Sequence, residues 1–326
     1  MDATFKSVFV PEQHVTVDES LWRYKGRHHA IQFNPSKRAR FGLKVYKLCA
    51  SGGPSHAYTS AFKVYMGQDR SEIPASQRAV RELMDRAGLF DLGYELYLDN
   101  WYSSPHLFHY LQSRKTNAIG TVRADRKAMP RPKLEVKKKG DFTIRSSRTG
   151  MLCLAWMDKR QVTLLSTVHT GKKWVSLPPA HDGTVRRKPL AVADYNKGMG
   201  GVDVSDQLAI SYLTRRKCKK WYHNLFFRLV DTAIVNALCV HKYLGGTLDQ
   251  KAFRMKLLKS FLTARLRGGP RELQPHRQLH RQVQLPRRRR CQECAKTKRR
   301  KELKWGCSHC NVALCPGECF WAYHRW

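Results

Sequence analysis

Three aspartates stand where predicted strands or glycine-rich turns end, and carboxylates at such places can bind metal ions. Asp18 lies in a strand-like run, Asp99 ends a short apolar strand, and Asp203 closes a glycine-rich run. Asp206 follows one helical turn later, on the same face as Asp203 if that segment is helical. Two divalent cations held by carboxylates can activate a nucleophile and stabilise the leaving oxygen in phosphodiester cleavage. The ordinary alternatives are a strand-end turn at Asp99 and a helix N-cap at Asp203.

The end of the chain carries cysteines at spacings typical of zinc sites. Six of the ten cysteines follow residue 290, as two Cys-x2-Cys pairs and one Cys-x3-Cys pair. Two closed tetrahedral zinc sites need eight ligands, and seven are evident. His276, His280 or His309 could supply the eighth. The seven predicted zinc ligands are Cys291, Cys294, Cys307, Cys310, Cys315, Cys319 and His324.

Zinc in so short a segment would be structural, because the segment has no core without metal. Two alternatives remain open, which are unligated thiols and a RING-type ubiquitin-ligase surface. The flanking charge favours a module that reads DNA or a histone tail, since residues 265–301 hold 14 Lys and Arg against two Glu. The other four cysteines are scattered and are interpreted as ordinary buried thiols.

The charge of the chain predicts a polyanionic partner. With 61 Lys and Arg against 25 Asp and Glu, the net charge is +36, and a chain this basic repels itself unless it meets negative charge. Nucleic acid is favoured over a membrane surface, because the sequence has no lipidation motif and no long basic amphipathic helix at an end. A membrane span is not expected either, because no window approaches about 18 uninterrupted apolar residues. The start of the chain also lacks the pattern of a signal peptide, so secretion is not expected.

Two basic clusters are the predicted DNA contacts, through the phosphates. The second cluster also fits a nuclear localisation signal. The aromatic residues of 221–227 could stack on DNA, but helix-core packing is the favoured interpretation. The predicted contacts are Arg215, Arg216, Lys217, Lys219, Lys220, Arg287, Arg288, Arg289 and Arg290.

The elements that must position these residues indicate a mixed α/β fold. Three β-rich runs come first, and then strands and helices alternate, as expected for an α/β or α+β core. The predicted strands are 14–22, 42–49, 57–67, 94–98 and 118–122, with helices from Pro74 to Gly88 and from Pro105 onward.

The second half of the chain changes character twice. A β-rich stretch with a hairpin over 151–168 follows a Pro- and Lys-rich break, and a glycine-rich segment, 195–203, precedes a helical region. Helices are predicted over 204–244, with a basic break at 215–220, and over 249–266. Residues 267–290 are Pro-, Gln- and Arg-rich and predict a linker.

Several collinear motifs together resemble the piggyBac family of transposases and their domesticated derivatives. No single motif is specific, but the set covers almost the whole chain. The motifs are Val17-Asp18-Glu19-Ser-Leu, Lys25-Gly-Arg27, Arg40-Phe-Gly-Leu-Lys44, Leu98-Asp99-Asn-Trp-Tyr-Ser-Ser104, Asp158-Lys-Arg160, Tyr195-Asn-Lys-Gly-Met-Gly-Gly-Val-Asp203, Asp206-Gln207 and the terminal Cys/His module.

The resemblance implies an RNase H-like core interrupted by an inserted β-rich domain, then a helical segment and a small zinc-binding module. The implied domains are 1–123 (first part of the core), 124–188 (inserted domain), 189–213 (last part of the core), 214–266 (second half of a helical DNA-binding and dimerisation domain), 267–290 (basic linker) and 291–326 (zinc-binding domain).

The resemblance also implies a chemistry. Asp18, Asp99 and Asp203 would form a Mg²⁺-binding triad with two ions, and Asp206 would be a nearby additional acid. The triad would cut double-stranded DNA at element ends, through hairpins, and join the ends to TTAA targets. The family resemblance further implies a nuclear protein, a homodimer and two structural zinc ions.

Family members carry a sizeable region before the first catalytic strand, whereas 17 residues precede Asp18 here. We therefore expect an N-terminally truncated member of the family. Two functions stay open, an active transposase and a non-catalytic DNA- or chromatin-binding protein that uses the basic face and the zinc module.

Overall fold

The computed structural model describes most of the chain. The described residues are 1–35, 40–67, 72–176, 178, 187–214, 218–266, 280, 282–297, 299–308 and 310–324. The predicted contacts Arg215, Arg216 and Lys217 lie outside them, as do His276 and His309. The chain divides into two compact units, Met1–Tyr243 and Leu244–Trp326. No helix in the described ranges is long and apolar enough to cross a membrane.

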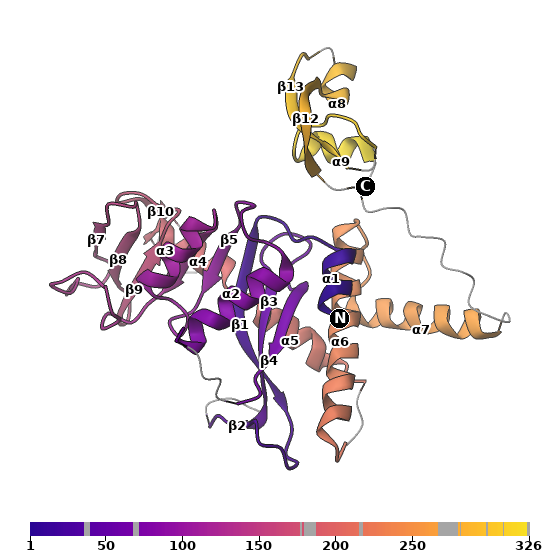
Figure 1. Ribbon diagram of the computed structural model, residues 1–326, viewed down its shortest axis with the longest axis horizontal. Coiled ribbons are helices and arrows are strands. Elements are labelled where there is room, and N and C mark those ends of the chain that lie inside the picture. Colours follow the sequence, from indigo (N-terminus) through magenta and orange to yellow (C-terminus); the bar gives the residue numbers. More distant parts are fainter. Residues whose placement is uncertain are drawn as a thin grey trace. The chain divides into compact units, whose positions relative to one another are not determined.

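The first unit is built on a nine-stranded mixed sheet with the order β2-β3-β1-β5-β6-β9-β8-β7, and β4 also pairs with β3 (Figure 1). The β1–β5 and β5–β6 pairs are parallel, and the other pairs are antiparallel. The predicted mixed α/β class is confirmed. The strands are β1 (His14–Arg23), β2 (Ile31–Phe33), β3 (Phe41–Ala50), β4 (Thr59–Val64), β5 (Glu95–Leu98), β6 (Asn117–Thr121), β7 (Phe142–Ser146), β8 (Leu152–Met157) and β9 (Gln161–Ser166).

Helices cover both faces of this sheet. On one face α2 and α3 pack against the inward side chains of β1 and β5, among them Val17 and Leu98. On the other face α4 packs against Tyr97, and α5 and α6 pack near Ala50. The helices are α1 (Asp2–Val8), α2 (Ala75–Ala87), α3 (Pro105–Ser113), α4 (Leu190–Gly198), α5 (Gly201–Ser211) and α6 (Trp221–Tyr243).

Helix α2 forms where the apolar spacing predicts it. Its buried residues, such as Val80, Leu83 and Ala87, recur on one helical face. Pro74 precedes its first turn, and Gly88 ends it in the left-handed conformation with φ +67°. Such a conformation suits a residue without Cβ, which explains why the helix stops there.

The glycine-rich segment 195–203 is helical rather than a turn. It contains the end of α4 and the start of α5, which meet at Met199–Gly200. The glycines are needed for close packing on the sheet. A Cβ on Gly198 would lie 2.2 Å from the Tyr97 ring, and one on Gly201 would lie 2.7 Å from the Ala50 carbonyl oxygen. From the sequence alone, the glycines of this segment indicate a flexible turn and not the close packing of a helix on the sheet.

Strands β8 and β9 form the predicted hairpin across the turn at Asp158. Strand β9 also pairs with β6, so β7, β8 and β9 continue the large sheet rather than form a sheet of their own. A separate two-stranded ribbon follows, β10 (Trp174–Ser176) with β11 (Arg187–Pro189). The division of the chain at 124 and 188 stays a prediction.

The second unit contains α7 (Gln250–Leu266), β12 (Gln282–Arg290), α8 (Gln292–Lys296), β13 (Glu302–Cys307) and α9 (Glu318–His324). Strand β12 pairs antiparallel with β13. The interpretation of 282–290 as part of a linker is therefore wrong. The composition of this strand has low β-propensity, and long-range pairing with β13 supplies the order that local sequence does not indicate.

We expect Gly201→Ala to lower the free energy of unfolding by about 1–3 kcal/mol, because the added methyl meets a backbone carbonyl that cannot rotate away. Gly200→Ala is the matched control, since its Cβ would be 4.0 Å from the nearest atom, on His56. Chemical denaturation of both variants checks this expectation. Equal stability of the two variants would contradict the close packing of α5 on the sheet.

Candidate active site and metal centres

Asp18 and Asp99 lie side by side because β1 and β5 are parallel neighbours. Val17 pairs with Leu98 in the register, so the next residue on each strand is an aspartate. Side chains alternate between the two faces of a sheet. Val17 and Leu98 point into the core under α2 and α3, and the two aspartates therefore face the side that α4 and α5 cover.

Asp203 joins this pair from α5. It lies in the first turn of the helix, after Gly200 at the N-cap, and its side chain is exposed. The alternative of an N-cap role for Asp203 is thus wrong, because Gly200 occupies that position. Its charge reaches Asp18, where it is one of the influences that raise the pKa of that carboxyl.

The raised pKa of Asp18 indicates a buried carboxylate whose negative charge is not balanced by a neighbouring positive charge. Burial is the largest cause that raises the pKa of Asp18 to about 7, and the negative charges of Asp99, Glu19 and Asp203 contribute to the same rise. The N–H of Glu19 donates to the Asp18 carboxylate at 2.7 Å and works in the opposite direction. A divalent cation would supply the missing positive charge.

Asp99 has a similar environment and also closes a local turn. Burial is the main reason that its pKa is raised, and the charge of Glu19 adds to it. The N–H of Trp101 donates to its carboxylate at 2.8 Å. The strand-end turn at Asp99 is confirmed and holds a carboxylate beside Asp18, and its role as a metal ligand stays a prediction.

The three carboxylates fit a magnesium site by their donor chemistry, since Mg²⁺ prefers oxygen ligands. Among the described residues, they are more widely spaced than the two groups whose ligand atoms all lie within 4.8 Å of one another. The raised pKa values of Asp18 and Asp99 come mainly from burial, with a smaller contribution from neighbouring carboxylates.

Asp206 has a partner of its own. The ammonium of Lys47, on β3, lies 3.2 Å from its carboxylate and donates to the Ser205 hydroxyl at 2.7 Å. The Lys47 side chain is only 1% exposed. A buried ammonium needs a compensating anion, and Asp206 supplies it. Sequence reasoning missed Lys47, because nothing in its local pattern indicates burial.

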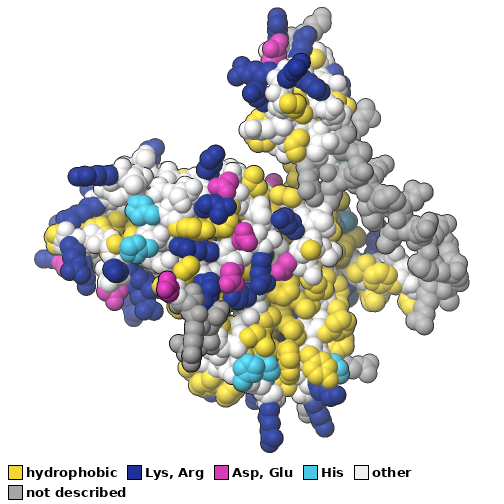
Figure 2. All heavy atoms as spheres, in the orientation of Figure 1, with side chains coloured by type: hydrophobic (Ala, Val, Ile, Leu, Met, Phe, Trp, Pro, Cys, Tyr) yellow, Lys and Arg dark blue, Asp and Glu magenta, His cyan; other side chains and the backbone are white. Residues whose placement is uncertain are grey.

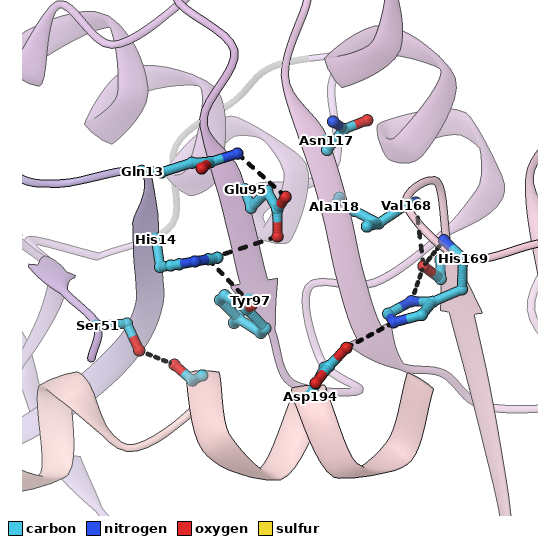
Figure 3. Close-up of polar contacts among 12 residues, drawn as sticks. Gln13, His14, Ser51, Glu95, Tyr97, Asn117, Ala118, Val168, His169 and Asp194 are labelled. Atoms are coloured by element: carbon cyan, nitrogen blue, oxygen red, sulfur yellow. Dashed lines mark hydrogen bonds and ion pairs between the residues drawn. The ribbon is translucent and has the colours of Figure 1, made fainter. Parts of the chain in front are cut away.

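Polar contacts attach α4 to the sheet (Figure 3). His169, after β9, pairs with Asp194 of α4 at 2.9 Å, and its other ring nitrogen lies 2.8 Å from the Ser166 hydroxyl. Ser51 donates to the carbonyl oxygen of Gly198. Ser166 is fully buried and accepts from two backbone N–H groups, so this Ser-His-Asp set orders a turn rather than presenting a nucleophile.

The second unit brings eight Cys and His residues into two groups of four. Ligand atoms within each group all lie within 4.8 Å of one another. His280, one of the three histidines that could supply the eighth predicted ligand, completes the second group. The groups are interleaved along the chain, because the second contributes residues before, between and after those of the first. They are Cys291, Cys294, Cys315 and Cys319, and His280, Cys307, Cys310 and His324.

The sulfur–sulfur distances in the first of these groups fit zinc. The Cys294 sulfur lies 3.8 Å from that of Cys315 and 3.6 Å from that of Cys319. Burial opposes ionisation of the Cys291 thiol, but hydrogen bonds from the backbone at Cys294 and Cys315 lower its pKa to about 7. Thiolates and imidazoles are the donors that Zn²⁺ prefers.

The predicted DNA contacts that the structure describes lie on the surface. Lys219 and Lys220 immediately precede α6, and both are exposed. Arg287–Arg290 form the exposed end of β12. Figure 2 shows Lys and Arg side chains gathered over the second unit and along the first. The Arg289 guanidinium donates to the backbone oxygen of Asn311 at 3.1 Å, and the exposure of all these side chains lets phosphates approach them.

Comparison with known proteins identifies the family. A family model described as transposase IS4 matches residues 1–238. The human piggyBac transposable element-derived protein 3 is 27% identical over 345 aligned residues, which cover 97% of this chain and 56% of that protein. The chain belongs to the piggyBac-type transposase family.

Another human relative in this family is piggyBac transposable element-derived protein 2, 26% identical over 274 residues that cover 78% of this chain and 45% of that protein. This piggyBac-type chain spans about half the length of the curated relatives it matches. A solved piggyBac transposase synaptic complex with hairpin DNA matches with a TM-score of 0.65 at 23% identity, over 95% of this chain and 70% of that one. That likeness shows the fold.

We expect Asp18→Asn to stabilise the protein in buffer without Mg²⁺. The folded-state pKa of about 7 exceeds the ordinary 3.8, so this carboxyl stabilises the fold at low pH and loses that contribution as pH rises through 7. The free energy of unfolding of Asp18→Asn should exceed that of wild type by on the order of 2 kcal/mol near pH 8 and by little near pH 4. Denaturation at both pH values measures it, with the exposed Asp125→Asn as control. A less stable Asp18→Asn variant near pH 8 would contradict it.

We expect Cys294→Ser to reduce bound zinc from about two ions per chain to about one or fewer, because a closed site loses one of four ligands. Metal analysis of the purified protein measures this ratio. Cys218→Ser is the control, since Cys218 lies in the first unit and outside both groups. Unchanged zinc in the Cys294 variant would remove that group as a metal site.

Proposed function

We propose that this chain performs the DNA cleavage and strand transfer of a piggyBac-type transposase, with Asp18, Asp99 and Asp203 as ligands of two Mg²⁺ ions. The observation that carries the proposal is the approach of these three carboxylates from β1, β5 and α5, where the charges of Asp99 and Asp203 add to the effect of burial in raising the pKa of Asp18 to about 7. In a chain with a net charge of +36, such a concentration of negative charge fits a cation site.

The proposed ions would activate water or a 3′-hydroxyl for attack on a phosphodiester and would stabilise the leaving oxygen. The protein positions their ligands. Parallel pairing fixes Asp18 beside Asp99, the turn at Trp101 orients the Asp99 carboxylate, and the close contact at Gly201 sets the height of α5 above the sheet.

The proposed substrate is double-stranded DNA, at element ends and at TTAA targets. Its support is the basic surface, together with the hairpin DNA bound by the structurally similar transposase. The exposed Arg287–Arg290 and Lys219–Lys220 would contact phosphates. The C-terminal unit would hold two structural zinc ions. We place the protein in the nucleus, acting as a homodimer.

A second function, non-catalytic binding of DNA or chromatin, is favoured by one observation. The curated relatives are named as transposable element-derived proteins, so members of the family exist beyond the elements themselves. This function would need the basic surface and the zinc sites but not the three aspartates. The two functions therefore differ in their response to loss of one carboxylate.

We expect Asp99→Asn to lower Mg²⁺-dependent nicking of a TTAA-flanked element end at least about a hundredfold, because a metal ligand contributes several kcal/mol to the transition state. DNA affinity should change by less than about threefold. Cleavage and gel-shift assays on the same duplex measure both, with Asp125→Asn as control. Equal cleavage by wild type and Asp99→Asn would refute the triad, and DNA binding without cleavage by the wild type would favour the second function.

A further inference from the structure

Lys47 is a buried cation beside the proposed metal site. It lies in the middle of β3, and in the β1–β3 register its direct partner is Asp18. Opposed residues of an antiparallel pair project to the same face, with Cβ atoms about 5 Å apart. A lysine at this position has the length to place its ammonium on the Asp18 carboxylate.

The ammonium is instead directed to α5. Its partners are the Asp206 carboxylate at 3.2 Å and the Ser205 hydroxyl at 2.7 Å. The described hydrogen bond of the Asp18 carboxylate comes from the Glu19 backbone. Lys47 is therefore a neighbour of both Asp18 and Asp206, and its ammonium pairs with Asp206, which is outside the proposed triad.

The direction of Lys47 is supported by a buried polar network. The Ser205 hydroxyl lies 3.2 Å from that of Thr59. The Thr59 backbone exchanges two hydrogen bonds, each of 2.8 Å, with the side-chain amide of Asn236 on α6. These contacts join β4, α5 and α6 around the ammonium and fix the oxygen atoms that receive it.

We propose that Asp206 is a positioning residue that holds the Lys47 ammonium away from Asp18 and so keeps the triad available to divalent cations. This inference rests on the proposed function of the triad. An ammonium on Asp18 would supply the positive charge that a metal ion supplies and would compete with it. Asp206 acts through Lys47 and is not itself a metal ligand, which differs from the role of additional acid that the family resemblance implies.

The proposal is tested by metal binding rather than by turnover alone. Mn²⁺ serves as the probe, because its free ion gives a paramagnetic resonance signal that disappears on binding. The full chain is used with its zinc retained. We expect Asp206→Asn to weaken Mn²⁺ binding about tenfold, since the amide holds the ammonium less strongly and Asp18 then competes for it.

The double variant Lys47→Met/Asp206→Asn decides between the two roles of Asp206. Methionine keeps the length of the lysine stem without its charge, so the competing cation is gone and Mn²⁺ binding should return to within about threefold of wild type. If Asp206 were a metal ligand, the loss would persist in the double variant. Persistence of the loss would therefore overturn the proposal.

Further variants separate this result from misfolding and from failure of the triad itself. Asp206→Glu retains the anion and should bind Mn²⁺ within about threefold of wild type, and thermal melting of each variant confirms that it is folded. Asp99→Asn should lose Mn²⁺ binding. If it does not, the proposed function fails, whereas normal binding by Asp206→Asn alone overturns only the role of Asp206.

Discussion

The parallel pairing of β1 with β5 is the constraint on which the proposed active site depends. It aligns Val17 with Leu98 and therefore sets Asp18 beside Asp99, although 80 residues of chain separate them. The pairing works against electrostatics, because the two neighbouring carboxylates raise the free energy of the folded sheet when they are ionised. The apolar core under α2 and α3, which buries the residues before both aspartates, holds the pair together.

The third carboxylate depends on a different kind of constraint, which is steric. Asp203 reaches the pair because α5 approaches the sheet at Gly201, where a side chain would meet the Ala50 carbonyl. The adjoining helix α4 is held on the sheet by the packing of Tyr97 against Gly198 and by the polar contact between His169 and Asp194. The backbone contact at Gly201 and the contacts of α4 with the sheet thus position α5, whose first turn carries the Asp203 carboxylate.

Local sequence patterns predict most helices and strands, whereas the remaining features of the fold depend on contacts between residues far apart in the chain. The apolar spacing of α2 and its stop at Gly88 are visible in sequence, since both depend on residues a few positions apart. The helical state of 195–203 is not visible, because its glycines serve contacts with distant strands. The burial of Lys47 and the selection of His280 are equally non-local. Strand β12 was missed for the same reason, as its order comes from pairing with β13.

The second unit shows how the proposed metal sites and the basic strand depend on each other. Strand β12 ends in four consecutive arginines whose charges repel. His280 and Cys291 flank this strand and belong to different ligand groups, so bound metal would fix both of its ends. The metal would then offset a repulsion that a small apolar core cannot. The arginines would remain exposed in a defined geometry, which a phosphate backbone can meet without ordering them first.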